Sequence, residues 1–404
     1  MKIVVLKFGG TSVGSIKRIK NVSKIVISYL KKRYKVIVVS SAMSGETNKL
    51  VKLTKQISNN FISSEYDPIV SAGEQVSCAL IAGRLNDQGY LARSWQGWQI
   101  PIFTQGNYSH SRVVNINKDK IIKFLRKGGI PIIAGFQGIN SDHRITTLGR
   151  GGSDASAIMI AKFFKAKKCI IYTDVDGIYT TDPNVVPKAK KIKKISYEEM
   201  LEMASLGAKV MQPHSIQDAR LNRIDIEVKS SLKNVSGSLI TKRKNVSSTN
   251  IIRGVSFTKN DTKITLVGVK DRPGVAANIF EPLFKNSINV DMVVQNISSN
   301  KKETDLTFTI KNEDLIKTEK LIKKNKKIKF KKIIIDRKVS KVSIVGVGMI
   351  TTPGVTFRMF NALAKKNINI LVISTSEIKI SVLVDKKNLK KAVDVLHKEF
   401  KLDY

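Results

Sequence analysis

The sequence predicts an α/β protein, with a mostly parallel sheet over the first 245 residues followed by two ferredoxin-like βαββα units. Two observations predict this fold class. Short apolar runs typical of buried strands alternate with helix-patterned segments up to about residue 245. Beyond that point the chain repeats itself, because residues 266–298 match residues 344–376. We therefore expect domains at 1–245, 263–330 and 338–404, with a polar linker at 242–250.

The parallel sheet is predicted from buried strands that end in glycines or small polar residues. Four apolar runs have this form: 3–8, 36–42, 130–136 and 169–174. The helix after the first run has one apolar face, which carries Ile19, Val22, Val26 and Tyr29. Ser196 and Glu199 form a capping box that opens a helix running to about Gly207. Ligands of such sheets gather at the carboxyl ends of the strands, where residues 7–10, 40–47 and 173–176 fall.

Each copy of the repeat is predicted as strand, Pro-Gly turn, helix, strand, strand and helix. Pro273-Gly274 in the first copy corresponds to Pro353-Gly354 in the second. The last helix places one group of apolar residues on a single face: Leu389, Ala392, Val393, Leu396 and Phe400. Two such units in tandem favour a binding module, since paired small sheets create an interface for a ligand.

Composition limits the class of protein. The 404 residues are 42% hydrophobic, and no apolar run approaches the roughly 18 residues of a membrane helix. Cys78 and Cys169 are too few for a disulfide framework, so we expect a cytoplasmic protein. The four histidines lack ligand spacing, and we expect no metal site built from protein residues.

The formal net charge of +39 raises the alternative of nucleic-acid binding. The lysines are spread along the whole chain, however, and recognised nucleic-acid modules are missing. The two densest runs, 188–194 and 323–332, are interleaved with Ile or Phe, which is typical of the solvated side of a strand or helix. We therefore expect neither nucleic acid nor a membrane as a partner.

The stretch GRGGSD at 149–154 predicts an anion site. Arg150 offers a planar fork for a carboxylate or phosphate. Gly151 and Gly152 let the main chain approach a ligand. Ser153 or Asp154 is expected to be the N-cap of the following helix, whose N-terminus attracts an anion. The alternative is an ordinary glycine turn into a helix.

Lys7 precedes the glycines Gly9 and Gly10 where the first strand ends, and this pattern favours phosphoryl transfer. Neither a P-loop nor a dinucleotide fingerprint is present in the sequence. A carboxylate acceptor needs no general base because it is already ionised at neutral pH. The acceptor carboxylate and the phosphoryl group are both negatively charged and repel each other. Lys7, Arg150 and the helix N-terminus would offset this repulsion. The alternative for the first motif is again a plain glycine turn.

Five strings together resemble the aspartate kinases: KFGGTSVG (7–14), SAGEQVS (71–77), PIIAGFQG (131–138), TTLGRGGSDAS (146–156) and YTDVDGIYTTDP (172–183). The second half resembles the tandem ACT regulatory domains of the monofunctional enzymes, and the resemblance covers nearly the whole chain. It implies an amino-acid kinase domain that phosphorylates the β-carboxylate of L-aspartate with ATP. The product would be 4-phospho-L-aspartate, in the first step towards lysine, threonine and methionine.

The resemblance also assigns roles to single residues. The expected catalytic residues are Lys7, Arg150 and Asp154. The expected aspartate contacts are Thr47, Glu74, Arg150, Gly151, Gly152 and Ser153, with Glu74 suited to the substrate ammonium. The expected nucleotide contacts are Lys7, Phe8, Gly9, Gly10, Thr173, Asp174, Tyr179, Asp182, Lys209 and Val210. Magnesium would arrive with ATP. The sequence departs from the family pattern at Asn184, at Glu46 and in MQPHSIQDA (211–219), which bears on nucleotide affinity more than on the reaction.

By the same resemblance, the paired ACT units bind lysine and/or threonine as effectors. The expected effector contacts are Asp271, Ala276, Ala277, Asn289, Asp291 and Gln295 in the first unit and Thr352, Asn369, Ile370, Ser376 and Glu377 in the second. In the family the strand near 251–257 can join the second unit. We expect a homodimer or higher oligomer joined through these units, or a heterotetramer with a short regulatory subunit.

Two other functions compete with this one. The first is another amino-acid kinase, such as a glutamate 5-kinase, an acetylglutamate kinase or a uridylate kinase, which the ACT pair and the FQG…TTLGRGGSD combination disfavour. The second is an amino-acid-binding regulator with an inactive kinase half, which the intact Lys7 and Arg150 segments disfavour.

Overall fold

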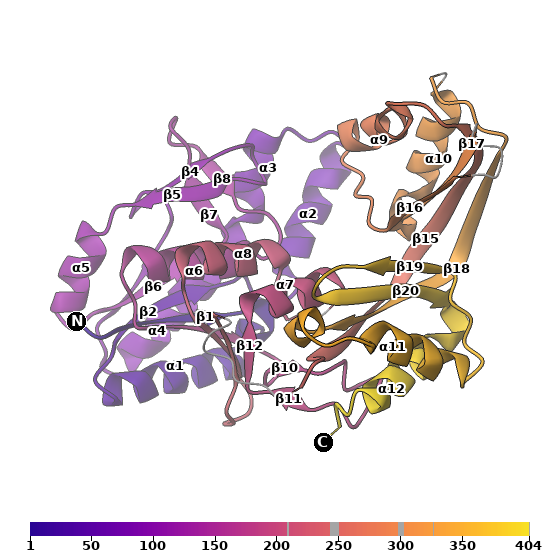
Figure 1. The fold of residues 1–404 in the computed structure, drawn as a ribbon. Helices are drawn as coiled ribbons and strands as arrows, with labels where there is room; N and C mark the ends of the chain where they lie inside the picture. The colour runs from indigo at the N-terminus through magenta and orange to yellow at the C-terminus, as the bar shows by residue number, and fades with distance from the viewer. Residues whose placement is uncertain (208–209, 243–249, 298–302, 326, 404) are drawn as a thin grey trace. The chain divides into compact units, whose positions relative to one another are not determined.

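The computed structural model describes residues 1–207, 210–242, 250–297, 303–325 and 327–403 (Figure 1). Two compact units divide the chain. The first comprises Met1–Ile178, Lys191–Ser205 and the described part of Lys209–Ser247. The second comprises the described parts of Tyr179–Lys190, Leu206–Ala208 and Ser248–Tyr404. Among the described residues, no helix is long and apolar enough to span a membrane.

The first unit is built on an eight-stranded sheet with the order β12-β14-β13-β9-β1-β2-β6-β3. Every pairing described within it is parallel except that of β13 with β14. The predicted mostly parallel α/β sheet is therefore confirmed. The strands are β1 (Ile3–Phe8), β2 (Lys35–Ser40), β3 (Ala92–Trp95), β6 (Ile130–Ala134), β9 (Lys168–Thr173), β12 (Lys194–Ser196), β13 (Ile226–Ser230) and β14 (Ser238–Thr241).

Helices cover both faces of this sheet, and α1 and α6 lie on opposite sides of β1 in Figure 1. Even-numbered residues of β1 pack with α1 and α4 in one core, so the odd-numbered ones point to the other face. The helices are α1 (Ile16–Lys31), α2 (Glu46–Ile57), α3 (Ser63–Val70), α4 (Ala72–Asp87), α5 (Asp119–Arg126), α6 (Gly152–Phe163), α7 (Tyr197–Ser205) and α8 (Pro213–Asn222), with the 3-10 helix η1 (Gly10–Val13).

A second sheet of four strands, in the order β5-β4-β7-β8, belongs to the same unit. Its strands are β4 (Ile102–Gln105), β5 (Arg112–Ile116), β7 (Gln137–Ile139) and β8 (Ile145–Thr147). The short strands β10 (Ile178–Tyr179) and β11 (Lys191–Ile192) follow later in the chain. The predicted capping box is confirmed, because Ser196 Oγ accepts from Glu199 N at 3.2 Å and Glu199 Oε2 accepts from Ser196 N at 3.1 Å.

The second unit contains a six-stranded sheet, in the order β16-β17-β15-β18-β20-β19, in which the two repeats lie side by side. The first repeat contains β15 (Gly254–Lys270), α9 (Val275–Lys285), β16 (Val293–Ile297), β17 (Glu303–Lys311), η3 (Asn312–Asp314) and α10 (Leu315–Lys324). The second contains β18 (Lys332–Val345), η4 (Val347–Ile350), α11 (Val355–Ala364), β19 (Val372–Thr375), β20 (Lys379–Asp385), η5 (Lys386–Asn388) and α12 (Leu389–Glu399). Both repeats therefore have the predicted βαββα order.

The repeats also agree in backbone detail. Gly274 and Gly354 take the same left-handed conformation, with φ of 87° and 85°, before α9 and α11. Ser287 and Asn367, at equivalent positions after these helices, have φ of 56° and 55°. The first residues of β15, Gly254 to Thr258, pair with the end of β18 in the second repeat.

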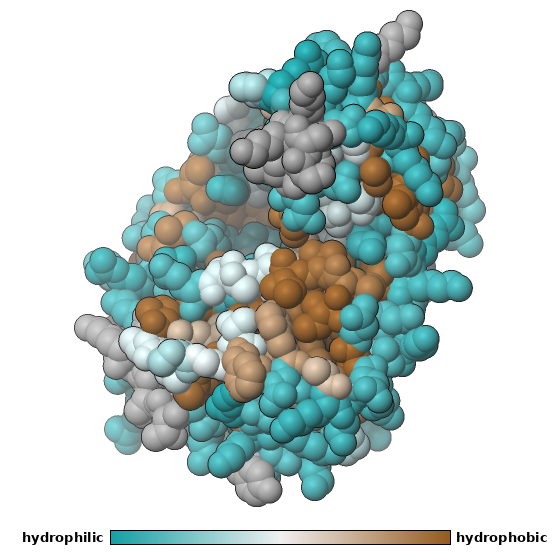
Figure 2. Space-filling model, turned by 45° about the vertical axis from the view of Figure 1, so that its right-hand side comes forward, coloured by the Kyte–Doolittle hydropathy of each residue, from teal (hydrophilic) through white to brown (hydrophobic). Residues whose placement is uncertain are grey.

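The surface in view in Figure 2 is largely hydrophilic. In the two dense lysine runs the described lysines are mostly exposed, whereas Ile192 and Ile328 are buried. This is the solvated-face arrangement that the interleaving predicts. Residues 243–249 of the expected linker lie outside the described residues.

Candidate active site

Lys7 lies near the carboxyl end of β1, between the parallel neighbours β2 and β9. Because side chains alternate along a strand, Lys7 points to the face opposite Leu6 and Phe8, towards α6. There its Nζ atom lies 2.6 Å from Oδ1 of Asp154, and both side chains are about 10% exposed. The structure thus joins two of the three predicted catalytic residues, which are far apart in the sequence.

The glycines after Lys7 keep the space beside its ammonium open. A Cβ atom on Gly9 would lie 3.5 Å from Lys7 Nζ, and one on Gly10 would lie 3.0 Å from the carbonyl oxygen of Ala42. The N–H of Gly9 donates to the carbonyl of Tyr172 at 3.0 Å, so this donor is already used. Phe8 stacks on Tyr172 with ring centroids 5.0 Å apart. With no side chain at Gly9, only main chain borders the ammonium on this side, which suits the approach of a phosphoryl group to the lysine.

The Arg150 segment forms a glycine turn at the N-terminus of α6. Gly149 and Gly151 have φ of 73° and 71°, which disfavours any side chain there. The predicted N-cap at Ser153 or Asp154 is wrong, because Gly151 is the N-cap and α6 begins at Gly152. Two left-handed glycines complete the turn earlier than the Ser-Asp pair suggested, which places Asp154 in the first helical turn. Arg150 is exposed and makes no ion pair with any described residue, so its guanidinium is available to a ligand.

Glu74 lies in the first turn of α4 and is only 3% exposed. Burial raises the pKa of its carboxyl to about 7, although main-chain hydrogen bonds at Ala42 and Glu74 and the charge of Lys7 oppose the shift. Its Oε2 atom is buried and has no hydrogen-bond partner among the described residues. A buried carboxylate oxygen without a donor suits a ligand that brings its own cation, such as an ammonium group.

The raised pKa of Glu74 predicts how stability depends on pH. The folded protein holds the proton up to about pH 7, whereas the unfolded chain releases it near pH 4.5, so this group destabilises the fold as pH rises between those values. Glu74→Gln removes the effect, which amounts to about 3 kcal/mol at most. We expect the variant to melt higher than the wild type at pH 8 and at about the same temperature at pH 4.5. An equal difference in Tm at both pH values would contradict this.

The arrangement is matched by known proteins. The amino acid kinase family matches residues 2–230, and an ACT domain matches residues 264–325 and 342–400. The chain is 46% identical to the aspartate kinase of Pseudomonas putida, over 100% of this chain and 98% of that protein. It is 44% identical to the aspartokinase of Geobacillus stearothermophilus, with the same coverage. The chain belongs to the aspartate kinase family.

Solved structures of this family agree with the fold. Aspartokinase III of Escherichia coli, in complex with aspartate and ADP in its R-state, superposes with a TM-score of 0.81 at 26% identity, over 98% of this chain and 99% of that one. The same enzyme in complex with lysine and aspartate in its T-state also gives a TM-score of 0.81, over 99% and 100% of the chains. Membership makes this chain an aspartate kinase, and therefore an enzyme.

Of the predicted nucleotide contacts, Thr173 and Asp174 lie together in the first unit. Thr173 ends β9 beside the end of β13, where Ser231 N donates to its carbonyl at 2.9 Å. Its Oγ1 donates to Asp174 at 2.9 Å. Ser12 and Ser231, whose hydroxyl groups are 2.8 Å apart, lie at the same edge.

The other predicted nucleotide residues are placed separately. Val210 is half-buried before α8, and Lys209 lies outside the described residues. Tyr179 and Asp182 belong to the second compact unit. The Asp182 carboxylate accepts from both nitrogens of Asn184, at 2.9 and 3.0 Å, so the departure at residue 184 closes a local turn. The nucleotide roles of these residues stay predictions.

Two of the predicted aspartate contacts, Thr47 and Ser153, have less distinctive surroundings. Thr47 is half-buried in the first turn of α2, which follows Gly45 at φ 88°. Glu46, which departs from the family pattern, forms an ion pair with Lys49 at 2.7 Å on the surface. Ser153 packs against Gly135, where an added Cβ atom would lie 2.8 Å from the Cβ of Ser153. Space at residue 135 therefore limits how the first turn of α6 can move.

The unusual segment MQPHSIQDA packs directly on the Arg150 turn, which sequence reasoning did not foresee. A Cβ atom on Gly151 would lie 2.5 Å from the Gln212 side chain and 3.4 Å from His214. Ser215 Oγ donates to the carbonyl of Gly151 at 3.3 Å. Burial lowers the pKa of His214, while the charges of Asp218 and Asp154 oppose that shift. The departure from the family pattern at 211–219 is the one feature of the sequence that could have indicated this contact with the Arg150 turn.

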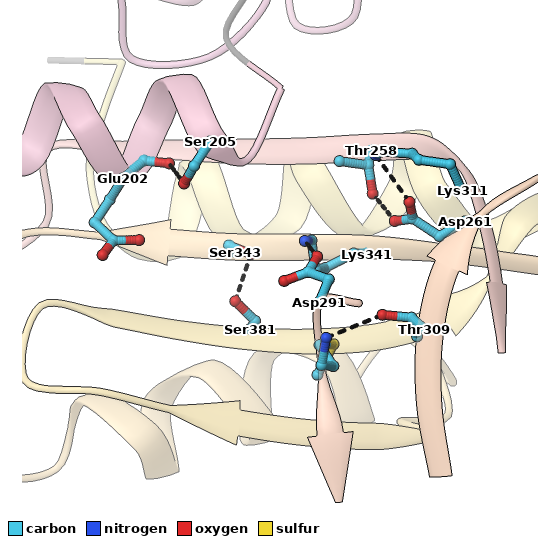
Figure 3. Close-up of polar contacts among 11 residues, drawn as sticks. Glu202, Ser205, Thr258, Asp261, Asp291, Thr309, Lys311, Lys341, Ser343 and Ser381 are labelled. Atoms are coloured by element: carbon cyan, nitrogen blue, oxygen red, sulfur yellow. Dashed lines mark hydrogen bonds and ion pairs between the residues drawn. The ribbon is translucent and has the colours of Figure 1, made fainter. Parts of the chain in front are cut away.

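Most of the expected effector residues are exposed and lie on turns and edge strands of the second unit, whereas Ala276 and Ala277 lie in the first turn of α9. Asp291, although exposed, already has a charged partner, because its carboxylate forms an ion pair with Lys341 of β18 (Figure 3). Met292 N donates to Thr309 Oγ1 at 3.1 Å beside it. Further polar pairs join neighbouring strands, such as Ser343 with Ser381 at 2.7 Å. Asp291 thus links the first repeat to the second, and its contact with an effector stays a prediction.

Proposed function

We propose that this enzyme transfers the γ-phosphoryl group of ATP to the β-carboxylate of L-aspartate, forming 4-phospho-L-aspartate and ADP. The observation that carries the proposal is the Lys7–Asp154 pair at the end of β1, with the buried carboxylate of Glu74 close enough to Lys7 for their charges to interact. The relative from Escherichia coli, solved with aspartate and ADP, supports the same pair of ligands.

In the proposed reaction an oxygen of the β-carboxylate attacks the γ-phosphorus as the bond to the β,γ-bridging oxygen breaks. The carboxylate is ionised at neutral pH, so no proton has to be removed from it. Lys7 neutralises charge on the transferring group, and Asp154 holds the ammonium in place. Glu74 binds the ammonium of aspartate and Arg150 binds its α-carboxylate. Thr47, Gly151, Gly152 and Ser153 complete this side.

On the ATP side we propose contacts from Phe8, Gly9, Gly10, Thr173, Asp174, Tyr179, Asp182, Lys209 and Val210. Gly9 places no side chain beside the Lys7 ammonium, which suits a phosphate group there. The described residues present no group of three His, Cys, Asp or Glu side chains that could hold a metal ion. Magnesium would arrive with ATP, where it neutralises phosphate charge.

We further propose that lysine and/or threonine act as effectors at the ACT units, and that the reaction is the first step towards lysine, threonine and methionine. The relative solved with lysine supports the first statement. The proposed domain limits are 1–245, 263–330 and 338–404. Two free, buried cysteines fit a cytoplasmic location.

A homodimer or higher oligomer joined through the second unit is also proposed, with a heterotetramer containing a short regulatory subunit as the alternative. Phe284 on α9 and Phe357 on α11 support an interface there, since they are 82% and 70% exposed. Large exposed aromatic side chains are typical of surfaces that another subunit covers.

The test of the proposed reaction is ADP release with aspartate, glutamate or N-acetylglutamate as acceptor. We expect aspartate to give a kcat/KM at least about tenfold above glutamate, because one methylene group is worth roughly that much in a fitted site. Lysine or threonine should lower the rate with aspartate. The Lys7→Ala enzyme serves as the control for contaminating ATPase activity. Turnover of another acceptor and none of aspartate would refute the proposal.

A further inference from the structure

Asp67 is a fully buried carboxylate that holds together two segments far from it in the sequence. It lies on α3 and is 0% exposed. Its Oδ2 atom accepts from the main-chain N–H groups of Ser109 at 2.8 Å and Thr147 at 2.7 Å. Its Oδ1 atom accepts from the hydroxyl groups of the same two residues, at 2.6 and 3.0 Å. Four uncharged donors thus stabilise one buried negative charge, whose burial would otherwise be costly.

One of these segments leads directly to the Arg150 turn. Thr147 is the last residue of β8, three positions before Arg150. Its carbonyl accepts from Ser111 N at 3.0 Å, and the next residue, Leu148, donates its N–H to Phe136 at 3.0 Å. The chain is therefore fixed up to Leu148, and the turn between there and α6 has few ways to place the arginine.

The other segment packs against the same turn. Ser109 takes a left-handed conformation with φ of 65°, which is unusual for a residue with a side chain. A Cβ atom on Gly149 would lie 3.0 Å from the carbonyl oxygen of Ser109 and 3.2 Å from Nδ1 of His110. Asp67 binds both the N–H and the hydroxyl of Ser109 and so stabilises the conformation that supports Gly149.

Asp67 is connected to Glu74 as well. The carbonyl of Asp67 accepts from Ser71 N at 3.2 Å where α3 passes into α4. The carbonyl of Ser71 accepts from Gln137 Nε2 at 3.1 Å. Glu74 follows in the first turn of α4. Asp67 therefore contacts both the end of β8, which precedes Arg150, and the α3–α4 junction, which precedes Glu74.

We propose that Asp67 is a positioning residue for the amino-acid acceptor, because it fixes the Arg150 turn relative to the helix that carries Glu74. The proposal rests on the proposed function of Arg150 and Glu74 as contacts to the two ends of aspartate. Aligning a charged substrate at two points requires that both protein groups be held to within a fraction of an ångström. Asp67 itself is buried and has all four of its bonds within the protein, so it acts through the main chain and not by touching the substrate.

The test compares the aspartate and ATP kinetics of Asp67→Ala and Asp67→Asn. The alanine variant leaves two buried N–H groups without an acceptor, and we expect its KM for aspartate to rise about tenfold or more, with the KM for ATP changed less than about twofold. In the asparagine variant the amide oxygen can accept from both N–H groups, while the amide nitrogen donates to the two hydroxyls. That variant should restore the KM for aspartate to within about threefold of the wild type.

Asn86→Ala is the matched control for loss of stability alone. Asn86 makes two side-chain bonds to the main chain of Ala92, at 2.8 and 3.0 Å, near the far end of α4. We expect a lower Tm with unchanged KM values. If Asp67→Ala does not fold, Thr147→Val and Ser109→Ala each remove one hydroxyl bond and should each raise the KM for aspartate selectively.

The outcomes of these measurements separate the hypotheses. Equal rises in both KM values, or a fall in Tm alone as in Asn86→Ala, would overturn the positioning role. Failure of the asparagine variant to restore the KM would overturn it too. Arg150→Ala is measured in parallel. If this variant leaves the KM for aspartate unchanged, the proposed substrate contact of Arg150 is rejected. If it raises the KM for aspartate while Asp67→Ala leaves that KM unchanged, only the role of Asp67 is rejected.

Discussion

Lys7→Ala is expected to lower kcat about 10²–10³-fold, the range seen when one preorganised donor to a developing charge is removed. Lys7 lies at the end of β1 with its ammonium 2.6 Å from Asp154 and beside Gly9, which has no side chain. The γ-phosphoryl group is already negatively charged in bound ATP and redistributes that charge in the transition state, where Lys7 is placed to stabilise it, so the loss should fall mainly on kcat and less on the KM for aspartate. Steady-state ADP release at saturating ATP and aspartate measures it.

The variant has a structural consequence that must be separated from catalysis. Removing the lysine leaves Asp154, which is about 10% exposed, without its ion-pair partner, and this costs stability. Melting temperatures and ATP binding by the variant show whether the fold survives. Lys2→Ala, which removes an exposed lysine that lies 4.2 Å from the Tyr34 ring, is the matched control and should keep its kcat. Unchanged turnover of folded Lys7→Ala would reject the phosphoryl role.

The sequence predicts the strands and the repeat well, because each depends on local patterns. Apolar runs that end in glycine mark the buried strands, and β1 has the bounds expected for it at residues 3–8. The Pro-Gly turn of each repeat leads into a helix with the same backbone geometry, since glycine alone takes φ near 85° without strain.

The contacts within the site could not be predicted in this way. Lys7 meets Asp154 because β1 lies between β2 and β9 and α6 covers that face, and no local pattern specifies this strand order. The predicted position of the α6 N-cap is wrong because the two left-handed glycines outweigh the capping preference of Ser153 and Asp154. Asp67 gives no signal in the sequence, since its donors lie 42 and 80 residues away.

Arg150→Ala is expected to raise the KM for aspartate roughly a hundredfold, the effect of losing a charge-assisted contact to a carboxylate. The KM for ATP should change far less. Arg150 is exposed between two left-handed glycines and has no ion-pair partner among the described residues, so its guanidinium is free to contact the substrate. Initial rates at varied aspartate and at varied ATP give the two values.

The comparison with other arginine variants makes the result specific. Arg150→Lys keeps the charge but loses the planar fork, so it should recover only part of the aspartate affinity. Arg126→Ala removes an exposed arginine at the end of α5 and should leave both KM values unchanged. A large rise in the KM for ATP with normal aspartate affinity would place the nucleotide at the Arg150 turn.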